Sequence, residues 1–333
     1  MPVFSASLST SLYTADIGGS FMRLAAHAPD GTLTLLAKQP TPAHDWPQFA
    51  DTLASMLAAH AHLDTEPQRA PLALSIAGLI DPLDGKALSA NIPCITGRKL
   101  AGELRARLGR EVFAANDADC LALAEAVSGA GAGHRVVFAA VLGTGVGGGL
   151  VADGRLIRGA GGVTGEWGHG PIVSTQCFVD AEAGGERTLI AVPRFACGCG
   201  QTGCVDTIGG ARGIERLHAH LHGANIESRT ILAAWSQGDA AAMRTLDVWR
   251  ELVAEPLAAL VNVTGASVVT VGGGLASAGA LIGRLDQAVR ARVLYRREQP
   301  LVVPGRYREE GGLIGAAWLA RHASSTNTER VSP

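Results

Sequence analysis

The chain has 333 residues, of which 47% are hydrophobic and 17% charged, and its formal net charge is −2. These values fit a well-buried globular protein of two ordinary domains. The charge balance gives no electrostatic footprint for nucleic acid, and no apolar run reaches the roughly eighteen residues of a transmembrane helix. The start of the chain lacks the features of a signal peptide, so we expect a cytoplasmic protein with reduced thiols.

Apolar periodicity and glycine positions predict an α/β fold for the first part of the chain. The expected elements are strands at 12–17, 21–27 and near 33–38, a helix at 46–61, a strand at 71–77, a helix near 98–108, a strand at 111–115 and a helix that begins near Asp117.

The pattern then restarts, because a strand at 135–142 is followed by a glycine turn at 143–149 and a return strand at 150–152. Each half therefore opens with strand, glycine turn and strand, which is a weak internal repeat in organisation and not in residue identity. The remaining expected elements are a helix at roughly 239–263, a strand at 267–271, a glycine turn at 272–274, a further helix and a last helix at 311–320.

This organisation predicts a smaller N-terminal α/β domain at 1–116 and a larger C-terminal α/β domain at 117–310. A C-terminal helix at about 311–322 is expected to pack back on the first domain. The Ser-rich start at 1–11 is expected to fray, and the Ser/Thr-rich tail at 324–333 is expected to be disordered.

Three glycine turns beside strands are candidates for phosphate binding, because glycine lets backbone N–H groups approach anionic oxygens. Each turn alone also fits a plain tight turn, but the three together predict a nucleotide held between two related domains. The candidate residues are Asp16, Gly18, Gly19, Ser20 and Arg23 in the first turn, Gly143, Thr144, Gly145, Gly147 and Gly148 in the second, and Gly273 and Gly274 in the third.

Three thiols lie within eight residues, at Cys197, Cys199 and Cys204, and His169 stands 28 positions before the first of them. This Cys₃His set is typical of a closed, tetrahedral, structural zinc site. Disulfides are the less favoured alternative in a reducing compartment. A closed site leaves no open coordination position, which excludes a zinc hydrolase. The other cysteines, at 94, 120 and 177, are scattered and read as ordinary thiols.

Several polar residues near these loops allow both a structural and a functional interpretation. Asn116-Asp117 at a strand-to-helix junction could cap the helix, or Asp117 could act as a general base. Zinc would bring Glu166 close to Asp206, and such carboxylates suit hydrogen bonding to a polyol. We interpret His218, His220 and His222 as a solvated helix face.

Taken together, the chain resembles the ROK family of bacterial sugar kinases and sugar-responsive regulators, from Leu12 to about His322. The most specific marks are the segments 165–169 (Gly-Glu-Trp-Gly-His) and 197–204 (Cys-Gly-Cys-Gly-Gln-Thr-Gly-Cys). Segments 89–93, 116–125 and 143–150 are most similar to the branch that phosphorylates N-acetyl-D-glucosamine, as is the enlarged loop between His169 and Cys197.

The resemblance implies a two-domain actin/hexokinase-like (ribonuclease H-like) ATPase fold with an interdomain cleft, and ATP-dependent phosphorylation of a sugar 6-hydroxyl. It implies that Asp117 is the base, that ATP binds with Mg²⁺, that Zn²⁺ is structural, and that the protein is a homodimer. From the charge and hydropathy given above, we expect no nucleic-acid or membrane partner. N-acetyl-D-glucosamine is the first choice of substrate. The residues implied to line the sugar site are Gly78, Asn91, Asn116, Asp117, Glu166, His169 and Asp206.

Three features depart from the family pattern and keep alternatives open. The family has Glu at the position of Asp206, and Thr-Lys at the positions of Ser20 and Phe21, where Arg23 could replace the lost charge. The first turn begins at Asp16, which leaves no room before it for the helix-turn-helix of family repressors. The alternatives are a kinase for N-acetylmannosamine, glucose or fructose, or a non-catalytic sugar-binding protein.

Overall fold

The structure is a computed structural model that describes residues 12–28, 30–64, 69–180 and 186–329. The expected frayed start at 1–11 and the last four residues of the expected tail, 330–333, lie outside this part of the chain. No helix among the described residues has the length and apolarity needed to cross a membrane.

Two compact units make up the chain. Unit 1 comprises Met1–Val127, Arg155–Thr164 and Glu309–Pro333, and unit 2 comprises Ser128–Gly154 and Gly165–Arg308. The helix that begins at Asp117 therefore lies in unit 1, although the sequence led us to begin the second domain at 117.

Unit 1 is built on a five-stranded sheet with the strand order β3-β2-β1-β4-β7. β1 pairs antiparallel with β2 and parallel with β4, β2 pairs antiparallel with β3, and β4 pairs parallel with β7. The strands are β1 (Leu12–Ile17), β2 (Phe21–His27), β3 (Leu33–Pro40), β4 (Leu72–Ile76) and β7 (Val112–Asn116).

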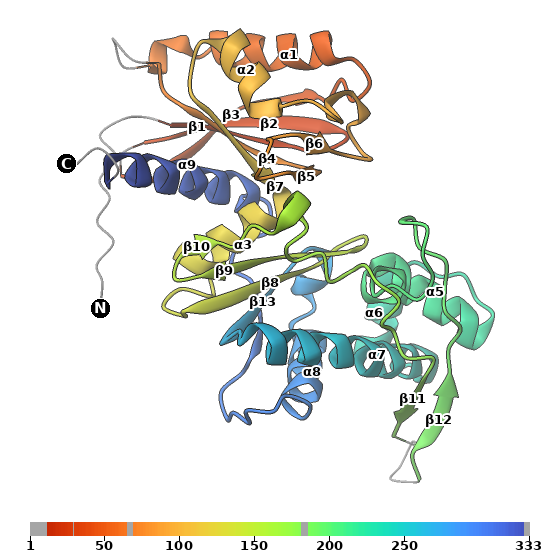
Figure 1. The fold of residues 1–333 in the computed structure, drawn as a ribbon. Coiled ribbons are helices and arrows are strands. Elements are labelled where there is room, and N and C mark those ends of the chain that lie inside the picture. The colour runs from red at the N-terminus through yellow and green to blue at the C-terminus, as the bar shows by residue number, and fades with distance from the viewer. Residues whose placement is uncertain (1–11, 29, 65–68, 181–185, 330–333) are drawn as a thin grey trace. The chain divides into compact units, whose positions relative to one another are not determined.

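Helices cover both faces of this sheet because alternate residues of its buried strands point to opposite sides. On β4, Leu72 and Leu74 enter the core under α1 (Trp46–Ala58) and α2 (Leu100–Leu108). The intervening Ala73 faces the other core, which small residues of α9 fill. Figure 1 shows α9 on the side of this sheet opposite to α1. The elements on that second face are α9 (Gly311–Glu329) and α3 (Asp117–Ser128).

Short elements outside this sheet also belong to unit 1. They are η1 (Ala61–Leu63), β5 (Leu79–Ile80), β6 (Ala87–Leu88), η2 (Pro93–Ile95), β10 (Arg155–Leu156) and η3 (Ala160–Gly162).

Unit 2 contains a sheet in which four strands follow the order β9-β8-β13-β14. β8 pairs antiparallel with β9 and parallel with β13, which pairs parallel with β14. This order repeats that of β2-β1-β4-β7 in unit 1, so the internal repeat expected from the sequence is present in the topology. The strands are β8 (Val136–Leu142), β9 (Val146–Ala152), β13 (Val268–Gly272) and β14 (Val302–Pro304).

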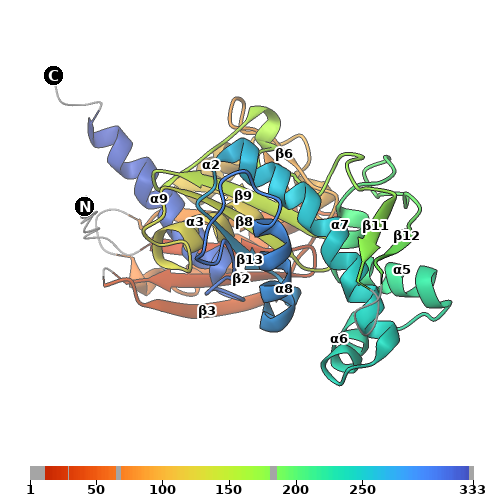
Figure 2. The same ribbon diagram turned by 90° about the horizontal axis from the view of Figure 1, so that it is seen from below.

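Helices and a hairpin pack around α7 in unit 2, and Figure 2 shows α7 extending from the sheet towards the hairpin β11–β12. Trp249 of α7 is fully buried, and its Nε1 donates to the carbonyl of Gly209 at 3.0 Å. The elements are β11 (Gln176–Val179), β12 (Thr188–Ala191), α4 (Asp206–Gly209), α5 (Ala211–His222), α6 (Ser228–Ser236), α7 (Ala240–Thr264), η5 (Gly274–Ser277) and α8 (Gly279–Arg290).

Three local expectations differ from the structure. The second glycine turn is shorter than expected, because β9 begins at Val146 and Gly147–Gly149 are strand residues. A Cβ at Gly148 would lie 2.7 Å from the ring of Phe138, so close packing explains this glycine. His218 is buried and not solvated, since its Nδ1 lies 2.9 Å from Thr245 Oγ1. α9 continues to Glu329, because extending an existing helix is far easier than nucleating one.

Because His27 is buried, we predict that unit 1 loses stability in acid. Burial, and then the charge of Arg321, lower its pKa from 6.5 to about 4, and its Nε2 lies 3.1 Å from Thr14 Oγ1. Between these two pH values the unfolded chain binds a proton that the folded chain does not, so the contribution is complete above pH 6.5 and lost as the pH falls towards 4. The loss amounts to about 3 kcal/mol at most.

The measurement is the free energy of unfolding in urea at pH 7 and at pH 4.5, for the wild type and His27→Gln. Glutamine keeps a hydrogen-bonding group for Thr14 and does not titrate. We expect the variant to lose less stability on acidification, by roughly 2 kcal/mol. Parallel pH dependences of the two proteins would contradict this role of His27.

Candidate functional site

The candidate residues of unit 1 lie at one edge of its sheet. The parallel strands β1, β4 and β7 end side by side, with Ile17 paired to Ile76 and Ile76 paired to Asn116. In open α/β sheets, ligands bind outside the carboxyl ends of parallel strands. The first glycine turn, Gly78 and Asn116-Asp117 all follow directly after these ends.

At the first turn, Asp16 is held by two side chains. Its Oδ2 forms an ion pair with Arg23, at 2.5 Å across the β1–β2 ladder, and its Oδ1 accepts from Ser75 Oγ at 2.7 Å. Arg23 also donates to the Glu309 carbonyl at 2.7 Å. Arg23 therefore neutralises Asp16 in this structure, whereas the sequence led us to expect a replacement for the missing phosphate-binding cation.

A second group of candidates is joined through Gly78. Asn116 Nδ2 donates to the Gly78 carbonyl at 3.1 Å. A Cβ at Gly78 would lie only 2.7 Å from Cβ of Ser89, so this position requires glycine. Exposed Asn91 lies two residues beyond Ser89, and a Cβ at Gly19 would lie 3.0 Å from the Asn91 carbonyl. The structure thus brings Gly78, Asn91 and Asn116 together beside the first turn.

Asp117 is exposed in the first turn of α3, so its carboxylate is accessible at the strand ends. Both Asn116 Oδ1 and Asp117 Oδ1 accept from the N–H of Ala118, at 2.8 and 2.9 Å. The structural interpretation therefore holds for Asn116, which caps the helix, and this helix N-terminus favours negative charge on Asp117.

Unit 2 places its glycine turns at the corresponding edge of the second sheet, since the end of β13 at Gly272 pairs with Val141 near the end of β8. Gly273 has a φ of 80°, and a Cβ there would lie 2.6 Å from the Leu142 carbonyl. The second and third turns therefore touch. Of the expected phosphate-binding residues, Gly143, Thr144 and Gly145 form the turn, whereas Gly147 and Gly148 lie in β9.

The donor atoms of His169, Cys197, Cys199 and Cys204 lie within 4.8 Å of one another. Cys199 Sγ is 3.6 Å from Cys204 Sγ, and Cys197 Sγ is 3.7 Å from His169 Nδ1. Tetrahedral zinc requires about 3.6–3.8 Å between such ligands. All six cysteines fall in the described part of the chain and are free thiols. These residues therefore fit a closed zinc site.

The pKa values of two thiols in this cluster are shifted in opposite directions. The backbone N–H of Gln201 is the main cause that lowers the pKa of Cys199 to about 6, while burial raises the pKa of Cys197 to about 11. Thiolates are the metal-binding form, and a bound cation would favour the thiolate at both positions.

Glu166 and His169 lie on one loop, where the N–H of His169 donates to the Glu166 carbonyl at 3.1 Å. The Nδ1 of His169 faces Cys197, and its Nε2 lies 3.8 Å from Glu166 Oε2. The pKa of Glu166 is raised above its ordinary value, mainly by burial. The neighbouring His169 opposes this rise, and the charge of Asp206 adds to it. Trp167 fixes the loop on β9, since its Nε1 donates to the Gly147 carbonyl at 2.7 Å.

Asp206 lies at the start of α4, and its side chain turns towards the second glycine turn. Its Oδ1 accepts from the N–H of Val146 at 2.8 Å, and its own N–H donates to the Gly168 carbonyl at 2.8 Å. The structure thus brings Asp206 to the same loops as Glu166 and His169, but its carboxylate binds protein backbone.

Sequence reasoning missed three residues that shape the first turn. Thr41 Oγ1 donates to the Gly18 carbonyl at 2.7 Å, and Ser75 binds Asp16. Lys38 on β3 holds its Nζ 4.3 Å from the centre of the exposed Phe21 ring, which places a cation beside the turn. The sequence predicted a strand near Lys38 but not the pairing of that strand with β2. No signal in the sequence therefore linked Lys38 to Phe21.

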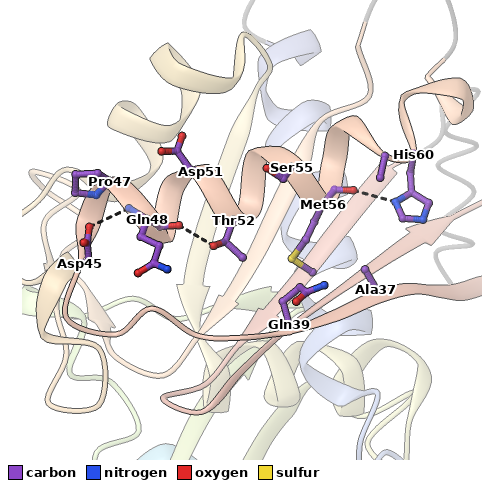
Figure 3. Close-up of a pocket in the computed structure, with 11 residues that line it drawn as sticks. Ala37, Gln39, Asp45, Pro47, Gln48, Asp51, Thr52, Ser55, Met56 and His60 are labelled. Atoms are coloured by element: carbon purple, nitrogen blue, oxygen red, sulfur yellow. Dashed lines mark hydrogen bonds between the residues drawn. The ribbon is translucent and has the colours of Figure 1, made fainter.

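A separate hollow of about 780 Å³ lies between α1 and β3 of unit 1 (Figure 3). Its polar groups are bound locally, as in the bond from Thr52 Oγ1 to the Gln48 carbonyl at 2.7 Å. None of the candidate phosphate, sugar or zinc residues is among those that line it. The hollow is therefore distinct from the candidate site.

Comparisons with known proteins agree with this arrangement. The model of the ROK family matches residues 12–323. An N-acetyl-D-glucosamine kinase of Photobacterium profundum is 34% identical over 309 residues, which cover 92% of this chain and 98% of that protein.

Two solved structures share the fold. A ROK hexokinase from Thermus thermophilus has a TM-score of 0.76 at 28% identity, covering 95% of this chain and 99% of that one. A ROK family glucokinase from Streptomyces griseus, solved with glucose and AMPPNP, has a TM-score of 0.71 at 26% identity, covering 94% and 99%.

The fold and the two sets of strand-end residues define an actin/hexokinase-like protein, which confirms the predicted fold class. The chain belongs to the ROK family. The predicted enzyme class, an ATP-dependent sugar kinase, is supported by the names of these relatives.

Proposed function

We propose that this protein transfers the γ-phosphoryl group of ATP to the 6-hydroxyl of N-acetyl-D-glucosamine. The observation that carries the proposal is the position of Asp117. This exposed carboxylate follows the end of β7 directly after Asn116, whose Nδ2 donates to the Gly78 carbonyl, on the sheet edge that also carries the first glycine turn and Asn91. A base, polyol-binding groups and a phosphate turn at one sheet edge are what a sugar kinase needs.

The chemical step follows from these residues. One oxygen of Asp117 accepts the proton of the 6-hydroxyl as the sugar oxygen attacks the γ-phosphorus, and the bond between the γ-phosphorus and the bridging oxygen breaks to release ADP. The N–H groups of Gly18 and Gly143 donate within their own turns, to the Phe21 and Gly145 carbonyls, so Gly19 and Thr144 are the candidates to donate to phosphate oxygens. Positioning and charge neutralisation account for most of the catalysis in phosphoryl transfer.

Mg²⁺ would neutralise phosphate charge, with Asp16 as the candidate to hold one of its waters. Zn²⁺ would be held by His169 and the three cysteines, and it would fix the loop that carries Glu166. His169 would then bind zinc through Nδ1 and a sugar hydroxyl through Nε2, so that the metal orients a specificity residue. The homodimer and the cytoplasmic location stay predictions.

The choice of N-acetyl-D-glucosamine rests on the 34% identical relative of that name. The Thermus and Streptomyces structures, at 28% and 26% identity, are a hexokinase and a glucokinase, so another hexose is the competing substrate. Glu166 and His169 supply an acceptor and a ring nitrogen within 3.8 Å of each other, which suits two neighbouring hydroxyls.

A panel of sugars tests the substrate. We expect ATP-dependent turnover with N-acetyl-D-glucosamine at a kcat/KM at least about tenfold above those for N-acetylmannosamine, glucose and fructose. ADP release at several sugar concentrations measures this directly. Good turnover of glucose or fructose with none on any N-acetylhexosamine would show that the substrate is wrong and leave the kinase assignment intact.

The same purified protein also tests the alternative that the chain binds a sugar without phosphorylating it. That alternative is favoured by the Asp16–Arg23 ion pair at 2.5 Å and by the departures at Ser20 and Phe21. Calorimetry that shows sugar binding, with neither sugar phosphate nor ADP formed, would establish it.

A further inference from the structure

Asp206 connects three segments of unit 2 that are distant in the sequence. Its Oδ1 accepts from the N–H of Val146, which closes the second glycine turn, at 2.8 Å. Its Oδ2 lies 3.9 Å from Sγ of Cys197, and its backbone N–H donates to the Gly168 carbonyl at 2.8 Å. One residue therefore links the glycine turn, the cysteine loop and the loop of Glu166 and His169.

The glycine turn depends on this part of the chain for its shape. Within the turn, Gly143 N–H donates to the Gly145 carbonyl at 3.0 Å. From outside, the N–H of Ala211 donates to the Gly143 carbonyl at 2.8 Å, and that of Arg212 donates to the Thr144 carbonyl at 3.3 Å. These bonds hold carbonyl oxygens, whereas Asp206 holds an N–H group.

Two glycines beside Asp206 and the turn are packed too closely to accept a side chain. A side chain at Gly145 would collide with the Asp206 carboxylate, and a Cβ at Gly210 would lie 2.8 Å from Cα of Gly145. Val146 is buried, so its N–H has poor access to water once the carboxylate is removed. The half-buried carboxylate has one oxygen fixed on the turn, and the backbone N–H of the same residue is fixed on the Gly168 carbonyl, so Asp206 ties the turn to the loop of Glu166 and His169.

We propose that Asp206 is a positioning residue that sets the conformation of the turn Gly143–Val146, and that it acts on nucleotide binding and not as a ligand of the sugar. The second part rests on the proposed function, in which this turn binds ATP phosphates. Sugar recognition in unit 2 then falls to Glu166 and His169. Asp206 thereby connects the loop of Glu166 and His169, through its backbone N–H, to the phosphate turn, through its carboxylate.

Three readouts on Asp206→Ala and Asp206→Asn test the proposal. They are calorimetric dissociation constants for AMPPNP and for N-acetyl-D-glucosamine, and amide hydrogen exchange of a peptide that covers 143–149. For Asp206→Ala we expect AMPPNP to bind about tenfold more weakly, the size of one lost charged hydrogen bond, with sugar affinity within about twofold of wild type. Exchange at Val146 should rise.

Asp206→Asn is the matched control, because its Oδ1 can still accept from Val146 and its amide can donate towards Cys197. It should bind AMPPNP within about threefold of wild type. If the negative charge of Asp206 were what nucleotide binding needs, this neutral variant would bind as weakly as Asp206→Ala. Zinc content is measured for both variants, and we expect it to match the wild type.

Other results overturn the proposal. Weakened sugar binding with unchanged AMPPNP affinity would make Asp206 a sugar ligand, and loss of zinc would make it a support of the metal loop. Unchanged exchange at Val146 in both variants would remove the positioning role. If Asp206→Ala fails to fold, Asp206→Asn with altered exchange at Val146 contradicts the role. If the wild type binds no AMPPNP, the proposed function fails, and exchange still decides whether Asp206 fixes the turn.

Discussion

Replacing Asp117 by Asn is expected to lower kcat by at least about a thousandfold while the affinities for sugar and nucleotide stay close to those of the wild type. Asparagine has the same shape but cannot accept the proton of the 6-hydroxyl. The helix should survive, because Asn116 Oδ1 also caps the N–H of Ala118 at 2.8 Å. The loss should therefore fall on the chemical step.

Steady-state ADP release gives kcat, and calorimetry with N-acetyl-D-glucosamine gives the sugar affinity. Asp51→Asn is the matched control, since Asp51 is an exposed carboxylate of α1 whose partner is Arg107. The control should retain activity within about twofold, as a surface change does. An Asp117→Asn variant with near wild-type turnover would show that another group is the base.

Replacing Cys199 by Ser is expected to remove zinc and to reduce activity by more than about a hundredfold. Structural zinc sites contribute directly to folding, and loss of one thiolate opens a closed tetrahedral site. The loop with Glu166 and His169 would lose its anchor, because His169 Nδ1 lies 3.7 Å from Cys197 Sγ within the same cluster. Unit 2 should also unfold at a lower temperature than in the wild type.

Metal analysis of purified protein, together with thermal unfolding and turnover, measures these effects. The wild type should hold about one zinc per chain. Cys94→Ser is the matched control, because Cys94 lies outside the cluster and its thiol donates to the Pro42 carbonyl at 3.5 Å, a bond that a serine hydroxyl can also make. Folded, active wild-type protein that persistently lacks zinc would contradict the structural role of the metal.

Local signals in the sequence account for much of the fold. Both strand–turn–strand units were predicted, because the turn Gly18-Gly19 and the glycine run at 143–149 each follow an apolar strand. The second turn was predicted too long, since β9 begins at Val146. The order β2-β1-β4-β7 and its repeat β9-β8-β13-β14 then follow from the pairing of these units with later buried strands. Cys197, Cys199 and Cys204 were grouped with His169 by residue type, and the structure places the four together.

Long-range contacts explain what could not be predicted. The bond between Asp206 Oδ1 and Val146 N joins residues 60 positions apart, and the motif around Asp206 gives no direction for its side chain. The same limit applies to Lys38 over Phe21, which depends on the register of β2 and β3. His218 was misplaced because it was grouped with His220 and His222 as one solvated face, whereas its side chain packs against Thr245 of α7.

The most direct test of the central claim is identification of the product formed from ATP, Mg²⁺ and N-acetyl-D-glucosamine. Phosphorus-to-proton correlation NMR assigns the carbon that bears the new phosphate. We predict equal amounts of ADP and sugar phosphate, with the phosphate coupled to the two protons on carbon 6. ADP formed without sugar phosphate, phosphate on another carbon, or no product from any sugar of the panel would contradict the assignment of this protein as a sugar 6-kinase.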